Sequence, residues 1–430
     1  MIEILSVALA GIFVGILTGL LPALPVFTGP FLLYYFYSDL PLEHMLVFWL
    51  TVVSGSQFFG SVATITTRIP GEESSLIYLE DLKKFTIEQK NKLLHDTALG
   101  SFVAGMLALM FIYLFVHYIN FDVLPWLAGM KFQMFIYSLA IIGFFFIEKK
   151  FFWTLLMIVA GIAISPNNNY ALPEVWYELQ YLTQGHTFYM LVLGTLLIPT
   201  IVFSDHSEAK VEGNFRATRS PYDIWLGIKS SVIGLVAGLI PGPSASIAAI
   251  GAYRSAGKET RKKIIAAETA NNSSVLTSAL PLLILGIPIN QNTLIMSNIL
   301  DMRGITITEW LLEPGVLGMS VIDTALLVVL GSLVLFYILS TNLINWYTAL
   351  IVGLHHKMKF ILLIILSGLI ALDISSNEIT WIEYVSLLSV LTAFGFLLKK
   401  YKVSPLPFLF AAILGNKLIW LYIQFFAINS

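Results

Sequence analysis

The sequence has no cysteine among its 430 residues, and only 12% of the residues are charged. The missing thiols exclude disulfides, thiolate metal sites and cysteine nucleophiles within this chain. Ordinary soluble domains have about 25% charged residues. Because 57% of this chain is hydrophobic, no aqueous fold could bury all of its apolar surface. The composition therefore predicts a protein that is embedded in a membrane.

Other absences narrow the function. The start, Met1-Ile2-Glu3, has no positively charged region before the first apolar run, which favours a first membrane helix over a signal peptide. No Gly-x-x-x-x-Gly-Lys-Ser/Thr loop occurs, so direct use of ATP by this chain is not expected. The seven histidines form no His-Glu-x-x-His constellation. We therefore expect no enzymatic activity, no metal site and no cofactor, and the net charge of −2 gives no reason to expect nucleic-acid binding.

Apolar stretches long enough to cross a membrane recur along the chain. A hydrocarbon core of about 30 Å needs about 20 helical residues. Shorter apolar pieces at 25–36, 151–165 and 244–253 resemble half-helices, and together these segments predict an all-α polytopic protein with about 12 crossings, some of them broken or re-entrant. The longer stretches are 4–21, 45–67, 96–117, 126–147, 187–203, 222–240, 319–339, 360–374, 382–398 and 407–427.

The chain also repeats itself at an offset close to half its length. Gly15 and Gly19 match Gly234 and Gly238 at an offset of 219, and Ile69-Pro70 matches Ile287-Pro288 at an offset of 218. Ordered matches at a nearly constant offset indicate an internal repeat. We predict a first membrane repeat over 1–205, a cytoplasmic linker over 206–221 and a second membrane repeat over 222–430.

Charged loops predict that the two repeats have opposite orientations. Lys and Arg accumulate in short cytoplasmic loops. The connection 254–263 contains five of them, whereas its counterpart at 37–45 contains none. Conversely, four lysines lie in 83–92, where the counterpart at 301–314 has only Arg303. Opposite sidedness of matching loops is typical of an inverted-topology repeat.

Breaks in the apolar helices are the predicted place of the chemistry. Exposed backbone groups are tolerated at membrane depth only around a cavity or within protein. A half-helix that begins there offers unpaired N–H groups and a positive dipole end to an anion. Matching breaks occur at 22–25 and 68–72 in the first half and at 241–246 and 285–288 in the second. Kinks that serve only helix packing are the alternative for any single break.

Polar runs lie beside these breaks. One is Glu268-Thr-Ala-Asn271-Asn272-Ser273-Ser274, and the other is Ser54-Gly55-Ser56-Gln57 with Gly60-Ser61. Amide and hydroxyl groups can donate to a carboxylate or accept from a cation, so one cluster could serve both substrate and coupling ion. The alternative is hydrogen bonding between helices, which we prefer for isolated residues such as Thr97 and Ser101.

These motifs, in this order, resemble the large membrane subunit of the tripartite tricarboxylate transporters, the TctA family. The matching stretches are Phe59-Gly60-Ser61, Ile69-Pro70-Gly71-Glu72 with Asp81, the segment 234–242, Glu268 to Asn272, and Pro281 to Pro288. The likeness runs from Gly11 to Gly415. Departures from the family pattern include Ala23 after Pro22, Ile289 after Pro288, Arg68 at a usually neutral position, and a shortened stretch between Tyr253 and Glu268.

The resemblance implies a secondary transporter of a small di- or tricarboxylate in the bacterial inner membrane. It implies two protein partners, a small membrane subunit and a periplasmic solute-binding protein, and symport with Na⁺ or H⁺. An anion channel or flippase on a related scaffold is the alternative function, and a membrane-embedded enzyme or a purely structural subunit are weaker ones. A channel would also use broken helices, but it would not need two matched halves.

The predicted site combines the breaks with the polar runs. Candidates for binding the coupling ion are Glu72, Asp81, Glu268 and Asn271. Candidates for binding the substrate are Pro22, Ser56, Gly60, Ser61, Arg68, Pro70, Gly71, Pro241, Gly242, Ser244, Ser246, Asn271, Asn272, Ser273, Gly286 and Pro288.

Overall fold

The computed structural model is helical, and the part of the chain that it describes contains no β-strand. It describes residues 2–21, 29–30, 40–68, 72–118, 150–165, 190–203, 215–240, 244–347 and 380–429, except 192 and 316, and scattered residues within 134–145 and 357–374. Five of the described helices are long and apolar enough to cross a membrane. The all-α membrane fold predicted from the sequence is thus confirmed, while the number of about 12 crossings stays a prediction.

The chain forms two compact units, and each unit takes one segment from each half of the sequence. Unit 1 contains Met1–Ile119 and Asp205–Met358, and unit 2 contains Asn120–Ser204 and Lys359–Ser430. The predicted division at 206–221 concerns the repeats rather than these units and stays a prediction. Much of the predicted linker, residues 206–214, lies outside the described residues.

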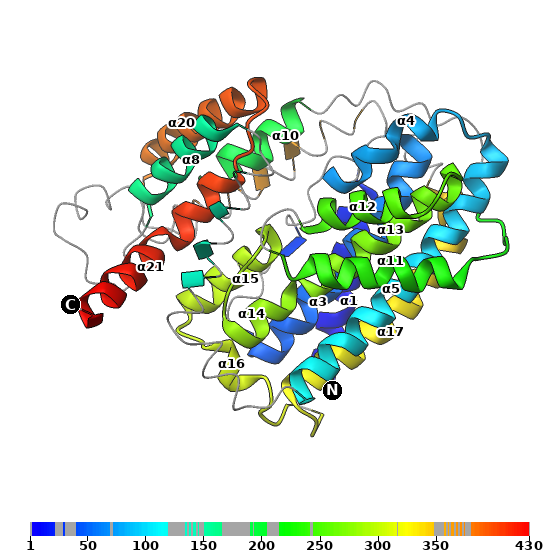
Figure 1. Cartoon of the computed structure of the whole chain (residues 1–430), viewed down its shortest axis with the longest axis horizontal. Helices are drawn as coiled ribbons and strands as arrows, with labels where there is room; N and C mark the ends of the chain where they lie inside the picture. Colours follow the sequence, from blue (N-terminus) through cyan, green and yellow to red (C-terminus); the bar gives the residue numbers. More distant parts are fainter. Residues whose placement is uncertain are drawn as a thin grey trace. The chain divides into compact units, whose positions relative to one another are not determined.

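Unit 1 is built around one fully enclosed helix, α3 (Leu42–Thr67), all of whose residues are buried. At 26 residues it is about 39 Å long, enough to cross a bilayer. The other elements of unit 1 surround it or follow it (Figure 1). They are α1 (Ile2–Leu20), η1 (Glu73–Tyr78), α4 (Leu79–Leu82), α5 (Ile87–Tyr118), α11 (Ile224–Gly238), α12 (Ser244–Ser255), α13 (Thr260–Thr277), α14 (Ala279–Leu285), α15 (Gln291–Met302), α16 (Ile307–Trp310) and α17 (Val321–Asn342).

The buried face of unit 1 includes one polar helix, α13. Every residue of α13 from Ile264 to Thr277 is buried, including the run from Glu268 to Ser274. Lipid offers no hydrogen bonds to such side chains, so a polar helix is stable at membrane depth only when other protein elements enclose it. Helices α5, α11, α12 and α3 supply this enclosure.

The matched glycines pack in the same way in both halves. Gly19 of α1 lies against α3, where an added Cβ would be 2.6 Å from the carbonyl oxygen of Ser56. Gly238 of α11 lies against α13, where an added Cβ would be 2.6 Å from the carbonyl oxygen of Ser274. Both pairs therefore need glycine, because only a residue without Cβ lets the two backbones approach so closely.

The helix boundaries repeat at the same offset. Helix α3 begins at Leu42 and ends at Thr67, and 218 residues later α13 begins at Thr260 and α14 ends at Leu285. The second-half helix is interrupted at Ser278, where Pro281 has no N–H to offer the carbonyl of Thr277. Equal boundaries and equal glycine contacts are what an internal repeat predicts.

At one end of unit 1 the residues after η1 contact the second half of the chain, and at the other end the residues after α15 contact the first half. At one end, Asp81 after η1 accepts hydrogen bonds from Lys84 and Tyr253, and Lys263 lies 5.1 Å from the Tyr253 ring centre. Arg303 after α15 donates instead to the carbonyl of Leu40, just before α3. Elements α4 and α16 mark opposite ends of the unit in Figure 1.

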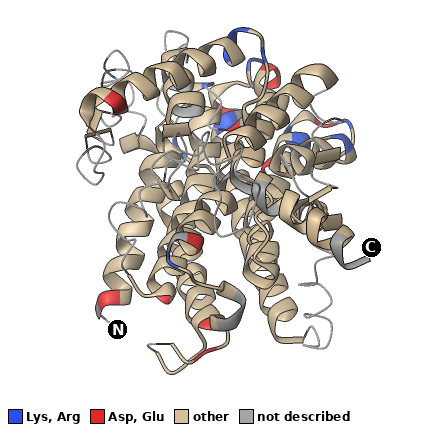
Figure 2. Ribbon diagram, turned by 90° about the vertical axis from the view of Figure 1, so that its left-hand side faces the viewer, with Lys and Arg blue, Asp and Glu red and all other residues tan. Residues whose placement is uncertain are grey.

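The lysines of 83–92 thus lie beside the basic connection 254–263, as their predicted common cytoplasmic side requires. Figure 2 shows the charged positions along the ribbon. The reciprocal end contacts support opposite orientations of the halves. The orientation of each half relative to the membrane stays a prediction.

The glycine contacts allow a first prediction about stability. We expect Gly238→Ala to lower the free energy of unfolding by about 1–3 kcal/mol, because the new methyl group overlaps the backbone of α13. Thermal unfolding of the purified protein in detergent would measure the change. The matched control is Gly331→Ala in α17, where no atom lies within 4 Å of the added Cβ and alanine favours the helix. Equal stability of the two variants would contradict the close packing of α11 on α13.

Unit 2 is described in less detail. It contains α8 (Phe151–Ala163), η4 (Leu193–Leu197), α10 (Ile198–Phe203), α20 (Trp381–Lys400) and α21 (Leu406–Asn429). Helix α8 packs on α21, where Gly161 lies against the carbonyl of Phe408, and α20 packs on η4. Lys150 donates to the carbonyls of Tyr401 and Lys402, which joins the start of α8 to the residues after α20.

Candidate functional site

Helices α3 and α13 meet at a polar contact in the interior of unit 1. The side-chain amide of Asn271 donates to Gln57 Oε1 at 2.8 Å and to Glu72 Oε2 at 3.1 Å. Asn271 is only 2% exposed, and its own Oδ1 has no partner in the described structure. The Asn271 side chain thus connects the centre of α13 to α3 and to Glu72, the last residue of the break at 68–72.

Glu72 reaches this contact because the chain reverses after α3. Its backbone is extended, with φ −148° and ψ 162°, and it forms the N-cap position of η1. Glu72 Oε2 also accepts from the hydroxyl of Ser74 at 3.4 Å. The other oxygen, Oε1, is buried without a hydrogen-bond partner in the described structure, facing the space that Gly60 leaves beside α3.

A second buried carboxyl, that of Glu268 on α13, lies nearby and contacts η1. Glu268 is 2% exposed and stands three residues before Asn271 on α13, so the two side chains share one face of that helix. Its Oε1 accepts a hydrogen bond from the hydroxyl of Tyr78, the last residue of η1. We refer to Gln57, Glu72, Tyr78, Glu268 and Asn271 as the central polar cluster.

The helix ends beside this cluster have the same unusual backbone in both halves. Arg68 ends α3 with φ 60°, and Gly286 ends α14 with φ 65°, each directly before Ile-Pro. A positive φ is routine for glycine but costs an L-residue roughly 1–2 kcal/mol. Arg68 occupies this position at a cost in stability, which is the pattern expected when a side chain is kept for function.

Several predicted site residues are used for helix packing. The hydroxyls of Ser56 and Thr18 form a hydrogen bond between α3 and α1, and Ser61 donates to the carbonyl of Phe58 at 2.9 Å within α3. Ser273 donates to the carbonyl of Ser231 at 2.7 Å, which joins α13 to α11. Asn272 donates to the carbonyl of Glu268 at 2.9 Å within α13. The contacts of Ser56 and Ser273 fit the packing alternative, whereas those of Ser61 and Asn272 stay within one helix.

The remaining predicted residues are spread over three places. Ser244 is buried at the start of α12, Ser246 is partly exposed one position beyond Ala245, and Pro288 follows Gly286 after α14. Asp81 lies with Tyr253 and Lys84, outside the central polar cluster. Five predicted residues lie outside the described part of the chain, namely Pro22, Pro70, Gly71, Pro241 and Gly242.

Sequence reasoning did not single out Gln57 and Tyr78 as site residues. Gln57 could have been found, because it ends the polar run from Ser54 to Gln57 in an otherwise apolar part of the helix. Tyr78 carried no such signal, since tyrosines are common in this chain and its partner Glu268 lies 190 residues away.

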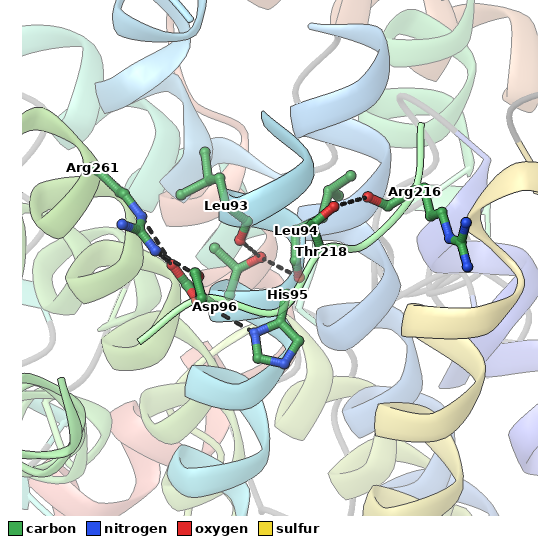
Figure 3. A network of polar contacts seen from close by, with 9 residues as sticks. Leu93, Leu94, His95, Asp96, Arg216, Thr218 and Arg261 are labelled. Carbon is green, nitrogen blue, oxygen red and sulfur yellow. Dashed lines mark hydrogen bonds and ion pairs between the residues drawn. The ribbon is translucent and has the colours of Figure 1, made fainter. Parts of the chain in front are cut away.

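A second polar network, also missed, lies where α5, α13 and the end of the predicted linker meet (Figure 3). The fully buried carboxylate of Asp96 accepts from Arg261 Nε at 2.9 Å and from Ser220 Oγ at 2.6 Å, with His95 Nδ1 at 3.4 Å. Asn91 holds the same segment by accepting from the backbone N–H groups of Arg216 and Thr218. The network fastens the connection between the two halves to unit 1.

Comparison with known proteins identifies the family. The family model described as "Tripartite tricarboxylate transporter TctA family" matches residues 5–410. The chain belongs to this family. The resemblance predicted from the sequence is therefore confirmed, and the family is one of transporters rather than enzymes. The family belongs to a tripartite transport system whose other parts are a solute-binding protein and a small membrane subunit. The five described helices of this TctA-family chain that are long and apolar enough to cross a membrane agree with this membership.

A second similarity extends over nearly the same length. A protein of Agrobacterium vitis described as "Uncharacterized 52.8 kDa protein in TAR-I ttuC' 3'region" is 24% identical over 440 residues, which cover 94% of this TctA-family chain and 83% of that protein. No solved structure matches the chain.

Proposed function

We propose that this chain is the transporting subunit of a tripartite system that carries a small di- or tricarboxylate into a bacterium across its inner membrane. It works as a secondary active transporter, with Na⁺ or H⁺ as the coupling ion, and with a small membrane subunit and a periplasmic solute-binding protein as partners. The observation that carries the proposal is the position of Asn271, which joins the buried polar helix α13 to α3 and to the residue after the first-half break.

The geometry suits an anionic substrate. Arg68 places a guanidinium at the end of α3, directly before the break, and its fork of N–H donors fits a carboxylate. The amide and hydroxyl side chains of Asn271 and Ser244 are buried in the same unit. A cation and several neutral donors would bind a di- or tricarboxylate without leaving a permanent excess of positive charge at membrane depth.

The test of the whole proposal is uptake by reconstituted protein. Proteoliposomes that contain the chain with its small membrane subunit, supplied with the binding protein, should accumulate radiolabelled di- or tricarboxylates when a Na⁺ or H⁺ gradient is imposed. Monocarboxylates and neutral analogues serve as the comparison. Equal flux of all of these solutes without any gradient would identify a channel instead.

Arg68 offers a substitution that removes the charge without straining the backbone. We expect Arg68→Gly to raise the half-saturating substrate concentration by about tenfold or more, because a hydrogen bond to a charged group contributes about 1.5–3 kcal/mol. The positive φ suits glycine, so the variant should be at least as stable as the wild type. Uptake kinetics and thermal unfolding in detergent measure the two expectations.

Lys402→Gly is the matched control. Lys402 also has a positive φ, 53°, but it lies at the exposed end of α20, so its replacement relieves the same backbone strain and removes the same charge far along the sequence from the break. Unchanged substrate affinity in Arg68→Gly would show that the guanidinium does not contact the substrate.

A further inference from the structure

Glu72 has an unusual environment for a carboxylate. One oxygen accepts from Asn271 and Ser74, while the other is buried without a partner in the described structure. Glycine at position 60 leaves the space for this second oxygen, since an added Cβ would lie 3.3 Å from it. The two groups that donate hydrogen bonds to the Glu72 carboxyl in the described structure are therefore neutral.

Three titratable groups on the surrounding elements η1, α12 and α13 have partners other than Glu72. Tyr78 on η1 donates to Glu268 on α13, so these two groups satisfy each other. Tyr253 on α12 donates to Asp81 instead, and Arg261 on α13 binds Asp96 of α5.

From this geometry we infer that the Glu72 carboxyl binds the proton that is transported together with the substrate. The inference rests on the proposed function and names its coupling ion. A negative charge on the buried Glu72 carboxyl is unfavourable, because its hydrogen-bond donors are neutral and the Glu268 carboxyl lies nearby. A proton on Oε1 removes this charge and its cost. The step forms one O–H bond on Glu72, and release of the proton on the other side of the membrane restores the carboxylate.

Glu72 suits this role better than Glu268. Glu268 stands in the middle of a continuous helix, and its carboxyl already accepts from Tyr78. Glu72 lies after the end of α3 and directly before η1, so its carboxyl is attached outside both helices. The hydrogen bond from the Asn271 amide depends on the protonation state, because it is stronger to a negatively charged Glu72 than to a neutral one, so protonation makes the amide more available to the substrate.

Charge repulsion would make the coupling obligatory. A substrate carboxylate that approaches Asn271 also approaches Glu72, and two like charges in a site of low dielectric repel each other strongly. Binding of the anion therefore requires that Glu72 first take up its proton. The result is symport of one proton by this site with each substrate anion.

The second half of the chain has the same backbone but not the same chemistry. Asn290, 218 residues after Glu72, is also extended, with φ −147° and ψ 179°, and also forms an N-cap position. Its side chain accepts from the backbone N–H of Thr293 at 3.0 Å and donates to Ser278 Oγ at 2.6 Å. The Asn290 amide does not ionise, so of these two matched positions only Glu72 can bind and release a proton.

The test separates proton coupling from substrate binding. In proteoliposomes with both membrane subunits and the binding protein, Glu72→Gln should reduce pH-gradient-driven accumulation of a di- or tricarboxylate by about tenfold or more. Exchange of internal for external substrate, which needs no net proton movement, should stay within about threefold of the wild type. Glu88→Gln is the matched control, because Glu88 is exposed and pairs with Lys92, and it should change neither rate.

The outcomes distinguish the inference from the proposed function. If the wild type exchanges no carboxylate at all, the proposed function fails. If the wild type exchanges and Glu72→Gln still accumulates substrate from a pH gradient, or if the wild type responds to a Na⁺ gradient alone, the proton role of Glu72 is wrong. Should Glu72→Gln not fold, substrate-induced proton uptake by the wild type in detergent decides, with about one proton per substrate expected and none contradicting the inference.

Discussion

Replacing Asp96 by asparagine is expected to lower the free energy of unfolding by about 3–5 kcal/mol, since this is the usual cost of removing one partner of a buried ion pair. The Asp96 side chain is fully buried and holds both Arg261 and Ser220. Asparagine has one acceptor oxygen and no charge, so it leaves the guanidinium without its counterion. Arg261 is 28% exposed and can turn towards water, which places the effect at the lower end of this range.

Chemical or thermal unfolding in detergent, followed by tryptophan fluorescence, would measure this loss. The control is Lys262→Gln, which breaks the neighbouring ion pair with Asp223, whose two side chains are 42% and 43% exposed. An exposed pair contributes about 0–1 kcal/mol, so this variant should be nearly as stable as the wild type. A double variant, Asp96→Asn with Arg261→Gln, should lose less than the sum of the two single losses. Equal effects of Asp96→Asn and Lys262→Gln would show that the network does not stabilise the fold.

Asn271→Ala is expected to weaken substrate binding strongly. The substitution removes the donor that joins Gln57 to Glu72 and also the unpartnered Oδ1, so the half-saturating substrate concentration should rise by about tenfold or more. Concentration-dependent uptake in proteoliposomes measures the change. Insertion should persist, because α13 is enclosed by four other helices.

Ser101→Ala provides the comparison for this variant. Ser101 is a buried residue of α5 whose hydroxyl has no partner in the described structure, so its removal should change neither folding nor transport. The site assignment would be refuted if Asn271→Ala and Ser101→Ala transported alike. Loss of folded protein in Asn271→Ala alone would instead indicate a structural role for the Gln57–Asn271–Glu72 contact.

Hydrophobic runs and the internal offset predicted much of the described fold. The run 45–67 became α3, the run 319–339 became α17, and the matched Ile-Pro pairs lie after helix ends with equal backbone angles at Arg68 and Gly286. Run length reports helix length directly, because the bilayer sets it. Repeats preserve backbone geometry even where side chains differ, as at Glu72 and Asn290.

Side-chain pairing could not be predicted in the same way. Glu72, Asp81, Glu268 and Asn271 were predicted to bind the coupling ion. The structure places Glu72 beside Asn271 on α13, the helix of Glu268, but Asp81 with Tyr253 and Lys84, and the binding roles stay predictions. Polarity alone, however, could not tell Asn271, which reaches across to α3, from Ser273, which only joins α13 to α11. The contact that each side chain makes depends on which neighbouring helix it faces. A polar helix that is enclosed on all sides has no apolar stripe, so its sequence does not indicate these neighbours.

The interleaving of the two units has a consequence for biogenesis. Asp96 is separated from Arg261 by 165 positions, and Gln57 from Asn271 by 214. At a synthesis rate of about 5–20 residues per second, Asp96 waits about 10–30 s for its counterion. During this interval the first-half helices hold polar groups that neither lipid nor their own half satisfies. The newly made first half is therefore an intermediate that the insertion machinery, rather than the finished contacts, must keep from misfolding or degradation.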